Sequence, residues 1–130
     1  HLCGNVANLS QRAAIAALEG GLDDVAMMRE QYDHRGKLIH RLLNEIDGVS
    51  CMLPQGAFYA YPSFEGVLGR ELAGQTPTNT LDLADVVLAE AKVAFVPGEA
   101  FGSPGYGRFA FALDPEDMQE GIRRIAEFLA

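Results

Sequence analysis

The chain has 130 residues, of which 48% are hydrophobic, and a formal net charge of −8. This length suits one compact domain with a real hydrophobic core. The acidic balance argues against nucleic-acid binding, because such a surface repels phosphate backbones, and no apolar run approaches the ~20 residues that a membrane span needs.

The cysteines and histidines predict neither a disulfide scaffold nor a metal site. Cys3 and Cys51 are isolated thiols, which suits a reducing cytoplasm, so we expect a cytoplasmic protein. The three histidines lack the i, i+4 spacing of metal ligands on a helix. No signal-peptide pattern is visible. Because the chain opens on His1 rather than methionine, we expect the natural polypeptide to extend further toward its N-terminus.

Two helices are predicted in the first part of the chain. Asn8 or Ser10 can cap the first helix, which a Gly-Gly pair ends. The second is longer and is expected over residues 22–46, before an Asp-Gly pair. Apolar residues at steps of three and four predict its buried face: Val25, Met28, Tyr32, Ile39, Leu42 and Ile46.

The middle of the chain predicts a strand, a long loop and a helix. Residues 56–64 are rich in aromatic side chains and are typical of a strand, which Pro62 limits to an edge or an end. Residues 65–79 are longer than most ordered connections, so a mobile loop or flap is expected. Thr80 is expected to cap the third helix.

The last part predicts two further strands and a helix. Residues 92–96 are apolar on both faces, which indicates a central buried strand, and residues 106–113 form another strand. Asp114 then caps a helix with proline in its first position. The apolar stripe of that helix is Met118, Ile122, Ile125 and Leu129. The expected fold class is α/β (α+β): a small three-stranded sheet with helices packed on one face.

Arg108 is a charged residue inside an apolar strand. Alternation places Phe109 and Phe111 on the face that packs against the last helix, and Arg108 on the opposite face. Such an arginine can face water or a local acid. It can also line a pocket: Gly107 and Ala110 leave room, and the planar guanidinium matches a carboxylate with two parallel hydrogen bonds. The residues alone leave both interpretations open.

Several segments resemble the C-terminal part of fold-type I pyridoxal-phosphate aminotransferases, above all the class I aspartate aminotransferase-like enzymes. These are PQGAFYAYP, AKVAFVPGEAFGSPGYGRFAFAL and a final helix ending IRRIAEFL, while NLSQRAAIAAL resembles the segment after the family's cofactor-lysine region. The resemblance implies a homodimeric enzyme that moves an amino group between an amino acid and a 2-oxo acid. It also implies that residues 1–47 link from a large domain and that residues 48–130 form the small domain.

By matching motif, Arg108 corresponds to the family's arginine that binds the substrate α-carboxylate. The resemblance places Gly56, Ala57 and Phe58 near the same site, and Asn5 in a stretch that approaches the partner subunit's active site in family dimers. The strand itself departs from the family pattern, which is nearer to LRLSYA, because this chain has GRFAFA. That difference bears on the shape of the pocket.

The chemistry of this family needs a lysine that forms a Schiff base with pyridoxal 5'-phosphate. Lys37 and Lys92 are the two lysines of the chain, and neither matches the family's lysine context. We therefore expect the isolated chain to be inactive and to bind no cofactor. The alternative is a stand-alone amino-acid-binding regulatory module without catalysis, which the upstream gene sequence would distinguish. A lyase or decarboxylase on the same fold would share Arg108.

Overall fold

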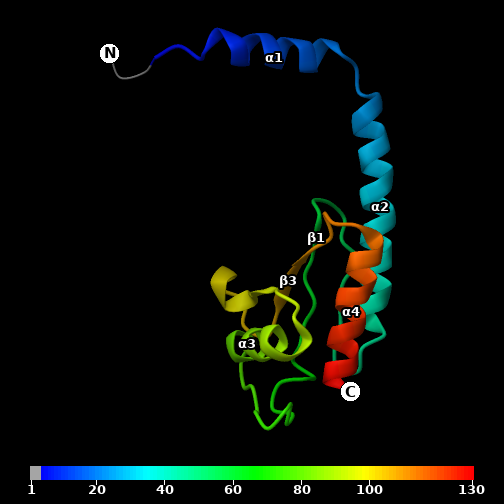
Figure 1. Ribbon diagram of the computed structural model, residues 1–130, viewed down its shortest axis with the longest axis vertical. Coiled ribbons are helices and arrows are strands. Elements are labelled where there is room, and N and C mark those ends of the chain that lie inside the picture. The colour runs from blue at the N-terminus through cyan, green and yellow to red at the C-terminus, as the bar shows by residue number, and fades with distance from the viewer. Residues whose placement is uncertain (1–3) are drawn as a thin grey trace. The chain divides into compact units, whose positions relative to one another are not determined.

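The computed structural model describes residues 4–130, and its contacts divide the chain into two units (Figure 1). The first unit ends at Gln31 and the second is Tyr32–Ala130. Helix α1 (Asn8–Glu19) belongs to the first unit, and helix α2 (Asp23–Asn44) begins in the first and continues into the second. The expected division of the whole protein between residues 47 and 48 stays a prediction.

The first unit exposes its apolar side chains. The residue that caps α1 is Ala7, with no side-chain hydrogen bond, so the expected capping by Asn8 or Ser10 is wrong. The helix ends as expected at Gly20, whose N–H donates to the carbonyl of Ala16. The exposed large apolar residues of this unit are Val6, Leu9, Ile15, Leu18, Leu22, Val25, Met27 and Met28.

The apolar stripe expected on α2 is buried only in its second half. Val25 and Met28 are exposed, whereas Ile39 and Ile46 are buried, and Tyr32 and Leu42 pack partly against the core. Helical periodicity identifies an apolar face, but it does not say whether this chain supplies a surface that covers it. In the second unit that surface exists, because α2 contributes to one hydrophobic core there.

The second unit contains an antiparallel three-stranded sheet in the order β1-β3-β2. Its strands are β1 (Tyr59–Ala60), β2 (Val96–Pro97) and β3 (Gly107–Ala110). The expectation of a central strand at residues 92–96 is wrong, because β3 is central and β2 lies at an edge. The strand also begins later than residue 92, because Lys92 ends the preceding helix in a left-handed conformation, with φ of 58°.

Helix α3 (Thr80–Ala91) begins at Thr80, the residue that was expected to cap it, so the helix starts one residue earlier than expected. Asn79 is the capping residue, and its side chain accepts a hydrogen bond from the N–H of Asp82. Thr80 is already helical and is fully buried, so the expectation that it caps the helix is wrong. Its hydroxyl has another partner, described below.

Helix α4 (Pro115–Leu129) agrees with its sequence pattern. The Asp114 side chain accepts from the N–H of Glu116, and proline occupies the start of the helix. The four residues of the expected stripe, and no others in this helix, are buried: Met118, Ile122, Ile125 and Leu129. No helix within residues 4–130 is long and apolar enough to cross a membrane.

The segment over residues 65–79 is folded onto the core rather than forming a separate flap. Val67 and Leu72 are buried, and Leu72 exchanges backbone hydrogen bonds with Gln75. The N–H of Gly69 donates to the carbonyl of Pro77. The segment is long for a connection, but it carries its own apolar side chains and pairs its own backbone, which anchors it.

Strand β3 alternates as expected. Phe109 and Phe111 are buried, whereas Arg108 is half-buried and Ala110 is exposed. The ring of Phe109 stacks on Phe95 with centroids 5.0 Å apart. The three-stranded sheet and its helices therefore confirm the expected fold class, and the alternation places Arg108 on the more open face.

Candidate functional site

The guanidinium of Arg108 packs against two aromatic rings. Its Cζ atom lies 4.5 Å from the ring centroid of Tyr59 and 4.5 Å from that of Phe101. Tyr59 comes from β1, where it pairs with Ala110, so it is a diagonal neighbour of Arg108 in the sheet. Phe101 ends the 3-10 helix η1 (Gly98–Phe101). Each cation–π contact of this kind contributes about 0.5–2 kcal/mol, depending on exposure.

Arg108 has no acidic partner in the described chain. Neither the ion pairs nor the side-chain hydrogen bonds found among residues 4–130 involve it. Arg123, by contrast, is bound to Glu120 and Glu127. The interpretation in which Arg108 pairs with a local acid is therefore wrong. Rings cover the guanidinium, while its N–H groups keep their capacity to donate to a ligand.

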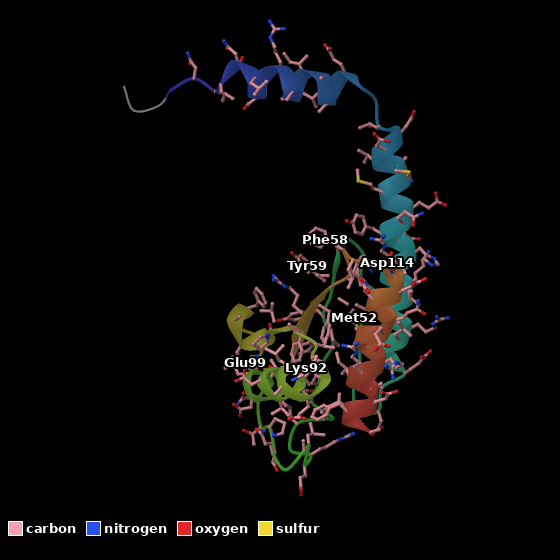
Figure 2. The ribbon with its side chains drawn as sticks, in the orientation of Figure 1. Met52, Phe58, Tyr59, Lys92, Glu99 and Asp114 are labelled. Carbon is pink, nitrogen blue, oxygen red and sulfur yellow. The ribbon has the colours of Figure 1, made fainter. Side chains whose placement is uncertain are left out.

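More aromatic side chains surround this arginine. We call Phe58, Tyr59, Tyr61, Phe101 and Tyr106 the aromatic cluster. Tyr61 stacks on Tyr106 with centroids 5.4 Å apart and meets Phe101 edge-on at 6.4 Å. Phe58 lies against Tyr59 at 4.5 Å, and Figure 2 shows these two side chains side by side. All members except Tyr61 are exposed, so the cluster presents an apolar surface beside a cation.

A tight turn holds Phe101 in place. The N–H of Gly98 donates to the carbonyl of Tyr106 at 2.6 Å, and the N–H of Ser103 donates to the carbonyl of Gly98 at 2.9 Å. A Cβ atom on Gly98 would lie 2.1 Å from the Ser103 carbonyl oxygen, so only glycine fits there. These bonds join the start of η1 to the start of β3.

Glu99 connects the same turn to helix α3. Its carboxylate accepts hydrogen bonds from the backbone N–H of Thr80, at 3.0 Å, and from the Thr80 hydroxyl. Burial by itself would raise the pKa of Glu99, but hydrogen bonds from the Thr80 hydroxyl and from backbone N–H groups, including that of Gly105, outweigh it. The pKa of Glu99 therefore lies below its ordinary value.

The other predicted site residues are placed as follows. Phe58 belongs to the aromatic cluster, and its carbonyl accepts from the N–H of Phe111 at 2.9 Å. Ala57 has a left-handed backbone, with φ of 56°, in the turn that leads to Phe58. Gly56 is exposed, with open space where a Cβ would be. Asn5 is exposed and belongs to the first unit. The roles of these four residues stay predictions.

Sequence reasoning missed Tyr59, Phe101 and Glu99. A signal for Tyr59 was present, because alternation in the strand expected over residues 56–64 places it on the same face as Tyr61. Phe101 lies within the glycine-rich motif, but nothing in that motif says that its ring meets the guanidinium. Glu99 had no signal, because its partner Thr80 is 19 residues away along the chain.

The two lysines do not fit a Schiff-base site for pyridoxal 5'-phosphate. The Nζ atom of Lys37 lies 2.6 Å from the carboxylate of Asp33 on the exposed surface of α2. Lys92 is exposed, and its Nζ donates to the carbonyl of Ala89. Figure 2 shows Lys92 apart from Phe58 and Tyr59. A Schiff-base lysine is instead activated in a desolvated pocket or beside another cation.

Comparison with known proteins gives consistent matches. The model of the family "Aminotransferase class I and II" matches residues 2–125. An aspartate aminotransferase of Streptomyces avermitilis is 54% identical over 130 residues, which is 100% of this chain and 32% of that protein. The chain thus spans about a third of the length of the curated relatives that it matches.

Solved structures agree with the sequence matches. The aspartate aminotransferase from Rhizobium meliloti superimposes with a TM-score of 0.89 at 36% identity, covering 92% of this chain and 30% of that one. The alanine aminotransferase from Pyrococcus furiosus gives a TM-score of 0.85 at 34% identity, covering 98% and 30%. The chain therefore belongs to the class I and II aminotransferase family, and it corresponds to the C-terminal part of an aspartate aminotransferase-like member.

Proposed function

We propose that the protein containing this chain is a pyridoxal-phosphate-dependent amino-acid aminotransferase, and that Arg108 binds the α-carboxylate of its substrate. One observation carries the proposal: the Arg108 guanidinium is held against Tyr59 and Phe101, and no carboxylate of residues 4–130 pairs with it. A positioned cation with unused N–H donors suits an anionic ligand.

The geometry gives Arg108 two tasks. Its planar edge can donate two parallel hydrogen bonds to a carboxylate, which fixes the orientation of the ligand as well as its position. An amino acid held in this way presents its amino group and Cα in one direction, and such orientation accelerates a reaction between bound groups. The exposed rings of the aromatic cluster would exclude water on one side of that carboxylate.

The amino-group transfer would be supplied by pyridoxal 5'-phosphate, held by groups outside this chain. The isolated chain is accordingly expected to be inactive. The resemblance to the family also supports a cytoplasmic homodimer, in which residues 1–47 link to a large domain and Asn5 lies near the partner subunit's site. Aspartate is the first amino donor to test, since it is in the name of the relative from Streptomyces avermitilis.

A direct assay tests the proposal. The full-length protein, supplied with pyridoxal 5'-phosphate, should convert aspartate and 2-oxoglutarate into oxaloacetate and glutamate. Arg108→Ala should abolish most of this activity. Arg41→Ala is the matched control, since it removes an arginine from the exposed surface of α2. Loss of activity in both variants, or in neither, would contradict the assigned role of Arg108.

A further inference from the structure

We propose that Glu99 is a positioning residue, which holds the Phe101 ring against Arg108 by fastening helix η1 to the first residue of helix α3. This inference rests on the proposed role of Arg108. Glu99 itself would touch neither the substrate nor the cofactor. It would fix the position of the carboxylate-binding arginine indirectly, through the Phe101 ring that contacts the guanidinium.

Glu99 is anchored at the N-terminus of helix α3. Thr80 is 0% exposed, and its N–H and hydroxyl both donate to the Glu99 carboxylate. The N–H groups in the first turn of a helix lack partners within that helix, and its N-terminus favours a negative charge. Leu83 and Val87 of α3 are fully buried in the core. Glu99, labelled in Figure 2, is therefore joined to a helix whose buried side chains are part of the hydrophobic core.

Phe101 connects Glu99 to Arg108. Phe101 follows Glu99 by two residues in the same short 3-10 helix, so a shift of the backbone at Glu99 also shifts the backbone that carries the Phe101 ring. Phe101 is 48% exposed, and its protein contacts include the edge-on contact with Tyr61. Packing contacts alone restrict the conformation of such an exposed ring only weakly. The link at Glu99 thus adds a constraint on where the ring meets the guanidinium, beside the backbone bonds of Gly98 with Tyr106 and Ser103.

Removal of the Glu99 carboxylate should loosen the Phe101 ring. Without Glu99, η1 keeps its bonds to Tyr106 and Ser103 but loses its link to α3. Phe101 then samples more positions, and Arg108 loses one of the two surfaces that hold it. The effect should be largest for ligands that use Arg108, because the Phe101 ring that Glu99 positions contacts the Arg108 guanidinium.

The test compares aspartate with β-alanine, which is aspartate without its α-carboxylate, using the full-length protein with pyridoxal 5'-phosphate. For Glu99→Ala, kcat/KM for aspartate should fall about tenfold, which corresponds to ~1.4 kcal/mol, mostly through a higher KM. The value of kcat/KM for β-alanine should stay within about twofold, since it excludes the step with 2-oxoglutarate, whose own α-carboxylate would use Arg108. Glu90→Ala, which removes an exposed acid from α3, is the control and should change neither value.

A double-mutant cycle connects the two residues. If Glu99 acts through Arg108, adding Glu99→Ala to Arg108→Ala should lower kcat/KM for aspartate by less than about twofold further. If Glu99→Ala does not fold, Glu99→Gln carries the same test, since it keeps the side-chain shape and removes the charge.

The outcomes separate the two proposals. An Arg108→Ala variant with normal activity overturns both, because there is then nothing to position. Suppose that Arg108→Ala is impaired, while Glu99→Ala or Glu99→Gln slows aspartate and β-alanine equally or only lowers Tm. The positioning role is then wrong, and the carboxylate-binding role of Arg108 stands.

Discussion

Replacing Arg108 by alanine should cost the full-length enzyme about one and a half to three and a half orders of magnitude in kcat/KM. The substrate carboxylate would then lie near the ring faces of Tyr59 and Phe101, which cannot replace the two charged N–H donors of the guanidinium. Leaving one member of a desolvated charge pair without its partner costs about 2–5 kcal/mol, and each ~1.4 kcal/mol is a factor of ten. The range of the expected loss follows from these two values.

Arg108→Lys should recover only part of the loss. An ammonium group can lie over the same rings, but it is a point charge and cannot reproduce two parallel hydrogen bonds. We expect kcat/KM about tenfold above that of Arg108→Ala and still well below that of the wild type, since roughly one charge-assisted hydrogen bond is regained.

The assay is steady-state kinetics with aspartate and 2-oxoglutarate. The cofactor absorbance of each variant controls for folding and cofactor binding, and Arg41→Ala controls for the loss of one positive charge. Part of the decrease should appear in kcat, because the carboxylate contact also orients the substrate. An Arg108→Ala enzyme with wild-type kcat/KM and normal cofactor absorbance would show that this arginine is only a surface residue of β3.

Three further changes probe the structure around the site. Gly107→Ala should lower the unfolding free energy of the full-length protein by about 1–3 kcal/mol in urea titrations, because the added Cβ would lie 2.7 Å from the Phe95 ring. Gly56→Ala is its control and should change the unfolding free energy little, because the space around Gly56 is open. Asp114→Ala should lower it by about 1 kcal/mol through loss of the α4 cap, measured in the same way. The stability difference between wild type and Glu99→Gln should be constant from pH 7 to about 5 and should shrink below about pH 4.

The sign of the pH effect follows from the lowered pKa of Glu99. The contribution of Glu99 is complete above its ordinary pKa of 4.5 and is lost as the pH falls through the lower pKa of the folded state. A difference that grows on acidification would contradict the described hydrogen bonds. Equal stability losses for Gly107→Ala and Gly56→Ala would contradict the close packing at Gly107, and an unchanged Asp114→Ala variant would contradict the cap.

Local patterns predicted the parts of the fold that local physics determines. The period of two in β3 placed Phe109 inside and Arg108 on the open face, and the period of 3.6 gave the buried stripe of α4. Each of these segments has a strong pattern and a covering surface within the chain. The resemblance to the family then assigned a role to Arg108, which alternation alone left open.

Features that depend on distant partners were not predictable in this way. The apolar pattern at residues 92–96 is compatible with a central strand, but the order of the sheet depends on how β1 and β2 pair with β3. Val25 and Met28 continue a helical stripe that this chain leaves exposed. The hydrogen bond between Glu99 and Thr80 joins residues 19 positions apart, and no local sequence pattern predicts that these two side chains meet.

The contacts of Arg108 with Tyr59 and Phe101 have a consequence for the entropy of binding. A free arginine side chain has about 2 kcal/mol of rotamer entropy to lose when a ligand immobilises it. Here the rings already restrict the guanidinium in the absence of ligand, so much of that loss occurs during folding. A preorganised arginine favours small carboxylates in particular, because such ligands have few other contacts to offset the ordering of a flexible side chain.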